Sequence, residues 1–202
     1  MVKPLDKTDP RLRTACKEIL RRDLHKKKTQ LTVDALLDYV YGRNNKGSRS
    51  NKAKPMTIGL SANQVGIMEK ICIVDFAVRR RDHSDVHIFL NPEILWHAKT
   101  IVNRWEGCVN FPDIWGEVPR YKSIKVKALD RWGNEFVITA KGWQAVLLQH
   151  EIDHLNGTLF IDRLEDPAKA HFVKPNQYKL YKKNHKHWKQ FIDVSKWAKK
   201  MG

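Results

Sequence analysis

Apolar positions recur at helical spacing near the start of the chain. In residues 11–28 they stand three or four apart within a strongly charged stretch, which predicts a first helix. Thr32 is a suitable N-cap for a second helix, because the apolar positions that follow it share one face before Gly42 ends the pattern. We therefore expect two N-terminal helices, each with one face against a core.

The spacing changes after a polar, basic stretch at residues 42–57. This stretch has no apolar periodicity, which predicts an insertion loop that is solvated or ordered by a partner. Runs rich in β-branched and aliphatic residues then predict strands, which we place at residues 70–76, 86–90, 93–102, 121–129 and 135–141. Their connections are too short for helical crossovers, so we expect antiparallel pairing.

An apolar helix is expected after the last of these strands, from near Gly142 to a stop at Gly157. From Gln177 to Ser195, aromatic and aliphatic residues return at near-helical spacing among lysines, which predicts a basic C-terminal helix. The predicted fold class is α+β, with antiparallel sheets packed around the central helix, helices at the N-terminus and the basic helix at the C-terminus.

The composition fits a single domain with one extension. The 202 residues are 42% hydrophobic and 30% charged, enough apolar material for one compact domain, which we place at residues 1–168. No apolar run approaches the roughly 18 residues of a membrane span, so an integral membrane protein is excluded. The N-terminus does not resemble a secretory signal and the three cysteines make a poor disulfide framework, which favours a cytoplasmic location.

The formal charge of +16 is unevenly distributed. Residues 1–57 carry +9, residues 58–168 carry −2, and residues 169–202 carry +9. A nucleic-acid substrate would favour positive charge on the folded body, whereas here the basic segments flank a nearly neutral body. We therefore expect the chemistry in the body and the partner contacts in the flanking segments.

The central helix contains His150, Glu151, Asp153 and His154 in an HExDH pattern. Histidines four residues apart share a helix face, so both can bind one metal ion while Glu151 moves a proton beside it. The alternative interpretation is an amphipathic helix with two partly exposed histidines that bind nothing.

A catalytic site with two histidines needs a third protein ligand. The extended metalloprotease pattern would place a histidine where Phe160 stands, and the next histidine is His171. Upstream, Cys108 lies in a segment that Gly107 and Pro112 make irregular, from which a thiolate can reach the helix. We take Cys108 as the third ligand.

Two other cysteines are weaker candidates for this ligand. Cys16 falls on the charged first helix, and Cys72 alternates inside an apolar strand and fits a core position.

Three motifs of the chain resemble those of peptide deformylases. The family patterns are glycine-apolar-glycine-apolar-Ala-Ala-x-Gln, then Glu-Gly-Cys-apolar-Ser, then His-Glu-x-Asp-His. The chain has residues 57–64, 106–110 and 150–154 in the same order and with the expected spacing, and the resemblance extends over about residues 5–165. The departures from the family pattern are Thr57, Ser61, Arg104 and Asn110. None of them removes a metal ligand or the acid/base; they concern the substrate fit and the backbone freedom of the loop.

The resemblance implies hydrolysis of N-formylmethionyl peptides to formate and a free N-terminal methionine. Cys108, His150 and His154 would hold a divalent ion, and Glu151 would act as the acid/base. The side-chain amide of Gln64 and the backbone N–H of Val109 would stabilise the oxyanion.

The resemblance also assigns supporting and substrate-binding residues. Glu106 and Arg120 would form an ion pair that holds the Cys108 loop, and Asp153 would orient a neighbouring group. Ile58, Val146 and Leu147 are candidate walls for the methionine side chain, although a core role suits each equally. Gly59 would let the substrate backbone approach, and Glu106 is also placed with these substrate-binding residues.

The expected cofactor is one divalent ion. One thiolate and two imidazoles accept Fe(II), Zn(II), Ni(II) or Co(II), and the resemblance implies Fe(II). The basic C-terminal helix predicts docking on ribosomal RNA, with packing on its own domain or an anionic membrane as alternatives. A monomer is favoured. The competing functions are a metalloendopeptidase of the HExxH type and a catalytically weak RNA-associated module.

Overall fold

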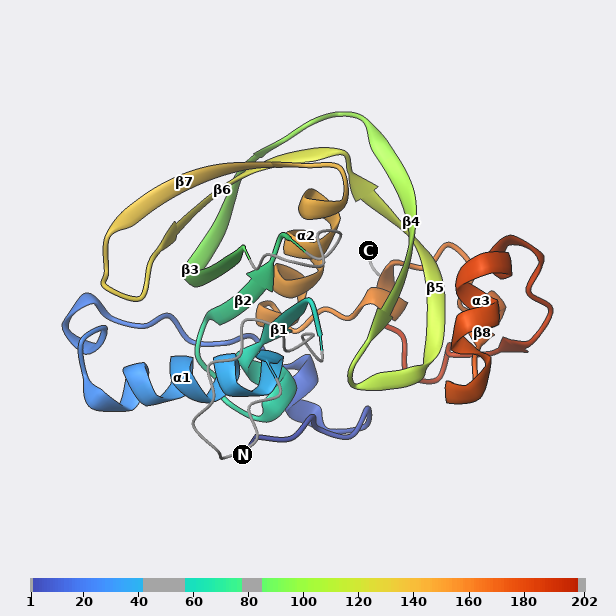
Figure 1. Ribbon diagram of the computed structural model, residues 1–202, viewed down its shortest axis with the longest axis horizontal. Helices are drawn as coiled ribbons and strands as arrows, with labels where there is room; N and C mark the ends of the chain where they lie inside the picture. Colours follow the sequence, from blue (N-terminus) through green and yellow to red (C-terminus); the bar gives the residue numbers. More distant parts are fainter. Residues whose placement is uncertain (1, 42–56, 78–84, 200–202) are drawn as a thin grey trace.

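The computed structural model describes residues 2–41, 57–77 and 85–199, which form two antiparallel sheets and three α-helices (Figure 1). The first sheet has the strand order β1-β2-β3-β6-β7. Its strands are β1 (Gly59–Ser61), β2 (Ile71–Asp75), β3 (Val86–His97), β6 (Ser123–Leu129) and β7 (Glu135–Lys141). The predicted α+β class and antiparallel pairing are confirmed.

Helices cover both faces of this sheet at β2, all five residues of which are buried. Cys72 and Val74 pack into the cluster that contains the apolar residues of α2 (Trp143–Leu155). Ile71 and Ile73 point the other way, into the cluster beneath α1 (Lys27–Tyr41). Because side chains alternate along a strand, a continuous apolar run here reports burial on two faces.

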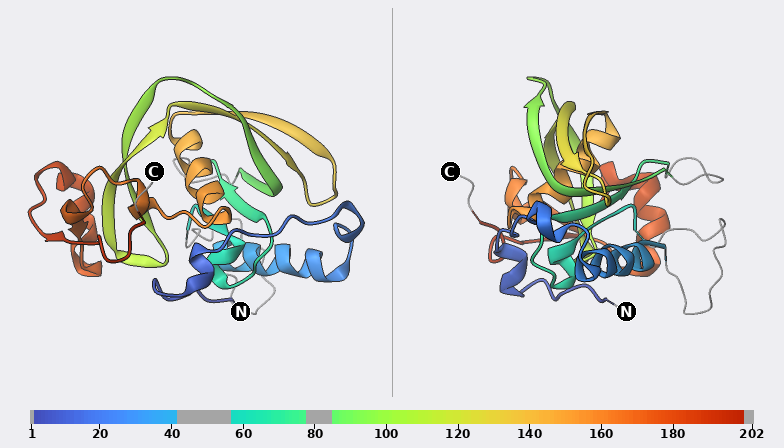
Figure 2. Two further views of the ribbon diagram at one scale, coloured as in Figure 1. Left: turned by 180° about the vertical axis from the view of Figure 1, so that it is seen from behind. Right: turned by 90° about the vertical axis from the view of Figure 1, so that its left-hand side faces the viewer.

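Helix α2 is the centre of the molecule and packs against strands of both sheets (Figures 1 and 2). Every residue from Ala145 to Leu155 is buried. The helix follows Gly142 and is followed by Gly157, both with positive φ (57° and 72°), which L side chains adopt only with strain. The predicted central helix carrying the HExDH pattern is confirmed.

The second sheet has the order β4-β5-β8-β9. A long hairpin of β4 (Ile101–Cys108) and β5 (Phe111–Tyr121) is joined by β8 (Ala170–Phe172) and β9 (Phe191–Ile192). The strand β5 was not predicted, because Gly116 and two prolines interrupt its apolar pattern. The register shift between Gly107 and Cys108 and the tight turn before Phe111 match the irregular segment expected around Cys108.

The predicted first helix, over residues 11–28, is wrong. Residues 14–20 are extended, between two short 3-10 helices, η1 (Pro10–Arg13) and η2 (Arg21–Asp23), and the α-helix begins only at Lys27. Its backbone is satisfied by distant partners: Cys16 N donates to Leu155 O at 2.8 Å, and Ile19 N to Asn91 Oδ1 at 2.9 Å. These tertiary hydrogen bonds replace the helical ones, so apolar spacing alone misidentified the element.

The second helix is confirmed, but α1 begins at Lys27, so Thr32 lies within it and is not its N-cap. The predicted break at Asn91 and Pro92 is also wrong. Strand β3 continues through both residues with a shift in register, and Asn91 takes a φ of 51°. The side chain of Asn91 bonds the backbone of the N-terminal segment at Ile19, which stabilises the bulge.

The described part of the C-terminal extension, residues 169–199, is packed on the fold, and its α-helical residues are those of the short α3 (Tyr178–Asn184). The predicted long basic helix is therefore wrong: β8 and β9 pair with each other, and β8 with β5. Tyr181 and Trp188 are buried against Trp105 and Trp115 of the second sheet. Trp188 Nε1 also donates to Phe172 O at 2.9 Å. Strand pairing with β5 and the burial of aromatic side chains on the β4–β5 hairpin therefore determine the structure here, although the apolar spacing is helical.

The insertion loop and the domain boundary both stay predictions. The insertion loop at residues 42–57 lies outside the described residues except for Thr57. The boundary after residue 168 separates two strands that pair with each other, β5 and β8. It stays a prediction. Among the described residues, none of the helices has the length and apolar character to cross a bilayer.

Candidate metal centre and active site

Three side chains that can bind a metal meet in the interior between the two sheets. Cys108 is the last residue of β4, and His150 and His154 are one turn apart on α2. Cys108 Sγ lies 3.3 Å from His154 Nε2, which lies 3.2 Å from His150 Nε2. The three ligand atoms all lie within 4.8 Å of one another and all three residues are buried. One ion can therefore bind all three atoms.

A buried ion pair orients the first histidine. His150 Nδ1 donates to Glu106 Oε2 at 2.8 Å, and Arg120 donates to both oxygens of Glu106 at 2.7 and 2.9 Å. Burial alone would raise the pKa of Glu106, but Arg120 and His150 lower it to about 2. The carboxylate thus stays ionised and fixes the hydrogen on Nδ1, which leaves His150 Nε2 for the metal.

The second histidine is held in its neutral form. Burial, together with the nearby positive charge of Arg120, lowers the pKa of His154 well below its usual value. Asn63 Nδ2 donates to the backbone oxygen of His154 at 2.6 Å, which ties this turn of α2 to the turn after β1. Neutral imidazole is the form that binds a metal ion.

Asp153 lies behind the metal ligands and joins two arginines. It accepts from Arg120, the partner of Glu106, and from Nε and Nη2 of Arg163 at 2.6 Å each. Charges of alternating sign therefore run from Glu106 through Arg120 and Asp153 to Arg163. The predicted role of Asp153 in orienting a neighbouring group stays a prediction, and Arg120 is one of the two groups it contacts.

Gln64 is buried with its amide nitrogen beside the metal ligands. Gln64 Oε1 accepts from Ser61 N at 2.7 Å, so the nitrogen points the other way. Nε2 lies 3.1 Å from Asn110 Oδ1, 3.2 Å from Cys108 Sγ and 3.1 Å from His154 Nε2. Gln64 Nε2 carries two hydrogens. One donates to Asn110 Oδ1, and the other points toward Cys108 and His154, where it can donate to a substrate oxygen.

Glu151 is a residue of α2, and its buried side chain lies against β1. Burial raises the pKa of its carboxyl above the usual value, although His150 and the hydroxyl of Ser61 oppose the shift. A Cβ added at Gly59 would overlap Glu151 Oε1 and lie 2.9 Å from Leu147 Cδ1. Glycine is therefore needed here to make room for the carboxylate. A carboxylate beside a metal site can accept a proton and release it again, which is the work of a general acid/base.

Most of the chain matches a known protein family. A model of the polypeptide deformylase family matches residues 3–170. The chain belongs to the peptide deformylase family.

Curated relatives and solved structures agree with this assignment. The peptide deformylase of Brachyspira hyodysenteriae is 43% identical over 119 residues, 57% of this chain and 63% of that protein, so the match spans less than two thirds of that relative. The peptide deformylase of Cellvibrio japonicus is 34% identical over 178 residues, 88% of this chain and 94% of that protein.

Two solved deformylases show the same architecture. The structure from Synechococcus elongatus in complex with actinonin has a TM-score of 0.71 at 25% identity, covering 99% of this chain and 92% of that one. The Met-Ala-Ser-bound enzyme of Acinetobacter baumannii has a TM-score of 0.68 at 27% identity, covering 81% and 98%.

The deformylase ligand set fits the chemistry of a transition-metal site. A thiolate and two imidazoles of fixed orientation, gathered in a buried space, are a donor set for borderline-soft divalent ions. The other two cysteines are core residues, as expected for Cys72. Burial raises the pKa of Cys72, and raises that of Cys16 to about 11. Both lie in the cluster beneath α2.

The metalloendopeptidase alternative lacks its third ligand. Phe160, in the position of the extended protease histidine, stacks beside His150 with ring centroids 6.1 Å apart. His171 lies in the extension, stacked on Trp105 at 4.2 Å. The deformylase set with Cys108 is the one that the fold assembles.

The candidate substrate residues occupy different positions around this site. Ile58 is partly exposed just before β1, while Val146 and Leu147 are buried on the first turns of α2. Val109 follows Cys108 in the turn and packs against the clusters on both sides. Both oxygens of Glu106 are engaged by Arg120 and His150, which favours the supporting role of Glu106 over substrate contact.

Three residues of this network were not predicted as site residues. Ser61 and Asn110 were noted only as departures from the family pattern, yet they contact Glu151 and Gln64. Arg163 lies outside every motif. Ser61 could have been recognised from the sequence, because it places a polar residue where the family motif has alanine.

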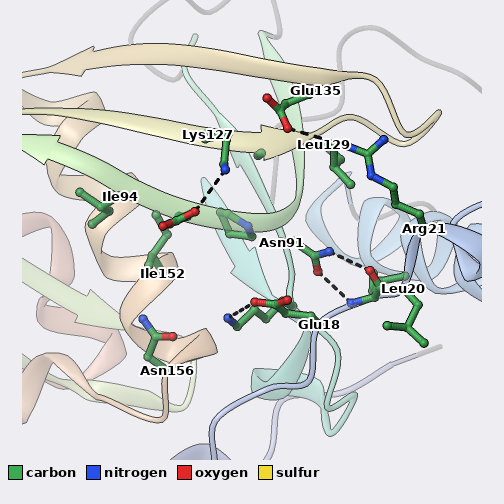
Figure 3. A pocket seen from close by; sticks show the side chains of 15 residues that line it. Glu18, Leu20, Arg21, Asn91, Ile94, Lys127, Leu129, Glu135, Ile152 and Asn156 are labelled. Atoms are coloured by element: carbon green, nitrogen blue, oxygen red, sulfur yellow. Dashed lines mark hydrogen bonds and ion pairs between the residues drawn. The ribbon is translucent and has the colours of Figure 1, made fainter.

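A separate cavity of about 700 Å³ opens on the other side of α2 (Figure 3). Ile152 and Asn156 line it, two residues along the helix from the metal-binding histidines. Its charged residues form ion pairs, Lys70 with Glu18 at 3.1 Å and Lys127 with Glu93 at 3.5 Å. The 15 lining residues include no histidine or cysteine, so this cavity lacks the thiolate and imidazole donors of the Cys108, His150 and His154 cluster.

Proposed function

We propose that this chain hydrolyses the N-formyl group from the N-terminal methionine of nascent polypeptides and releases formate. The observation that carries the proposal is the buried cluster of Cys108, His150 and His154 with Glu151 on the same helix. The binding of Met-Ala-Ser by the deformylase of A. baumannii supports a peptide with N-terminal methionine as product.

The proposed roles follow from the geometry. Cys108, His150 and His154 would hold a divalent ion, whose chemistry when bound would be to activate a water molecule and to polarise the formyl oxygen. Glu151, whose pKa is raised by burial, accepts a proton from the nucleophile and donates it to the leaving amine. Gln64 Nε2 and the backbone N–H of Val109 donate to the oxygen that becomes negatively charged.

The substrate side chain would lie against apolar residues near β1. Ile58, Val146 and Leu147 are the proposed walls, and Leu147 also contacts Gly59. In this proposal Gly59 both admits the peptide backbone and leaves space for Glu151.

The experiment that tests the activity is a formate-release assay on protein prepared without oxygen. Formyl-Met-Ala-Ser is expected to yield formate and acetyl-Met-Ala-Ser is expected to be resistant, because in this proposal the buried space beside Gln64 and Cys108 admits only the smaller formyl group. Glu151→Gln should keep the metal and lose turnover. Formate release by Glu151→Gln at the wild-type rate, or none by the wild type, would reject the proposal.

We propose Fe(II) as the working ion, with Zn(II), Ni(II) and Co(II) as ions that the same ligands accept. Each ion loaded separately into chelated protein should bind in a ratio of one per chain. The Fe(II) form should lose activity in air faster than the Ni(II) form. Equal stability of the two forms in air would contradict iron as the working ion.

We further propose that the extension docks on ribosomal RNA and that the protein acts in the cytoplasm as a monomer. Lys179, Lys183 and Lys186 are exposed on α3 and the turn after it, while the aromatic face is buried. The extension is part of the packed fold, so deleting it would disturb the domain and is not a clean test.

Charge reversal tests the docking without removing packed residues. Changing Lys179, Lys183 and Lys186 to Glu should release the protein from ribosomes at lower salt, with formyl-peptide hydrolysis unchanged. The matched control reverses three exposed lysines elsewhere, which are Lys99, Lys122 and Lys141. Equal loss of co-sedimentation in the two variants would reject docking by the extension.

A further inference from the structure

Ser61 is a fully buried hydroxyl next to the proposed acid/base. It is the last residue of β1 and has no exposed surface. Its Oγ lies 2.7 Å from Glu151 Oε2 and 2.8 Å from the backbone oxygen of the same residue. The family motif has alanine at this position, so the hydroxyl is a departure of this chain from that motif.

The carboxylate of Glu151 has contacts from β1 on both of its oxygens. Oε1 lies against Gly59, where no Cβ would fit, and Oε2 meets the Ser61 hydroxyl. Among the described residues, Ser61 is the side chain that donates a hydrogen bond to this carboxylate. Without it, Oε2 would face a methyl group and the carboxylate would be free to rotate about its last bond.

We propose that Ser61 is a positioning residue, whose hydroxyl holds the Glu151 carboxylate in the one orientation required for proton transfer. This inference rests on the proposed function of the same site.

A hydroxyl suits a carboxylate that gains and loses a proton during a reaction. Ser61 has one hydrogen and two lone pairs. It can donate to Oε2 while Glu151 is ionised. When Glu151 carries the proton, Ser61 can accept from it and turn its own hydrogen to the Glu151 backbone oxygen at 2.8 Å. Either way the carboxyl group keeps its place against β1.

The alternative is that Ser61 only satisfies the backbone oxygen of α2. The two roles differ in what they change. A structural hydrogen bond affects folding stability and leaves the catalytic constants alone, whereas a positioning bond affects the chemical step. Since a hydrogen bond to an ionised group is stronger than one between neutral groups, its loss should lower kcat by about tenfold.

The test compares Ser61→Ala with Ser123→Ala. Alanine is the family residue at position 61, so that variant is expected to fold. Ser123 donates to a backbone oxygen, Ala140 O, at 3.0 Å and lies away from the ligands, which makes it a matched control. Each protein is assayed with formyl-Met-Ala-Ser, its bound metal is quantified, and a crystal structure of the position 61 variant is determined.

We expect Ser61→Ala to lower kcat about tenfold with KM within about twofold, and to retain one metal ion per chain. Its crystal structure should show Glu151 Oε2 displaced from the wild-type position or in two orientations. Ser123→Ala should match the wild type in both constants. An unchanged kcat, or a carboxylate in its wild-type orientation, would overturn the inference.

Failure of the proposed function is a separate result. If wild-type protein released no formate, the proposed function would fall, and the orientation of Glu151 in the variant would still decide whether Ser61 holds it. If wild type is active and the variant retains its rate, only the role of Ser61 is rejected.

Discussion

Replacing Arg120 tests whether the buried charge network stabilises the fold around the metal ligands. The side chain of Arg120 is 2% exposed, and it donates to Glu106 at 2.7 and 2.9 Å and also to Asp153. Arg120→Met keeps the volume and removes the charge that both carboxylates face. Glu106 then keeps only His150 as a partner, and Asp153 keeps only Arg163.

The expected cost follows from that arrangement. Removing one partner of a buried ion pair costs about 3 to 5 kcal/mol, because it leaves a buried charge unpaired. Each carboxylate here retains one partner, which places the cost near the lower end, about 3 kcal/mol. For a chain of 202 residues this lowers the melting temperature by roughly 6 to 12 °C.

Arg163→Met provides the matched control, because Arg163 bonds the same Asp153 from a position where 33% of its side chain is exposed. Solvent weakens that ion pair, so the expected loss is about 1 kcal/mol or less. Both variants are unfolded in urea without metal, which separates folding stability from metal binding. The reasoning is refuted if Arg120→Met costs less than about 1 kcal/mol or if the two variants lose equal stability.

Three further predictions concern the site itself. Cys108→Ser should reduce bound metal far below one ion per chain, since a hydroxyl replaces the soft thiolate; elemental analysis showing full loading would exclude Cys108 as a ligand. Gly59→Ala should slow formate release by tenfold or more, because the new Cβ overlaps Glu151 Oε1, and a normal rate would contradict that overlap. Although burial opposes it, Arg120 and His150 hold the pKa of Glu106 at about 2, below its ordinary 4.5. The resulting stability is present above pH 4.5 and is lost as the pH falls toward 2. Urea midpoints should therefore fall more steeply in this range for the wild type than for Glu106→Gln, and parallel curves would refute the assignment.

The metal centre was accessible from the sequence because its pattern is local. His150 and His154 share a helix face whatever the rest of the fold does, and α2 is apolar enough to be recognised alone. Cys108 required a longer argument, since nothing in its spacing shows that β4 ends beside α2. The missing downstream histidine and the irregular segment around Cys108 favoured it as a ligand, the family motif agreed, and the structure brings the three ligands together.

The elements that sequence analysis missed depend on distant partners. The N-terminal segment is extended because Cys16 and Ile19 bond residues more than 70 positions away, at Leu155 and Asn91. Apolar spacing reports only which residues are buried, and Cys16 and Ile19 are indeed buried. The same reasoning explains Arg163, whose partner Asp153 is recognisable from a motif while Arg163 itself is not.

The structure also changes how the basic extension is understood. The charge pattern alone describes a separate arm with +9 over residues 169–202. In the fold, Tyr181 and Trp188 are buried against the β4–β5 hairpin, and Arg13 donates to both Asp162 and the backbone oxygen of Trp197. A surface that is already ordered loses little conformational entropy on binding, whereas a disordered arm must be ordered by its partner. The proposed docking on ribosomal RNA would therefore use lysines carried by a packed scaffold, and reversing their charge should weaken that docking without altering the active site.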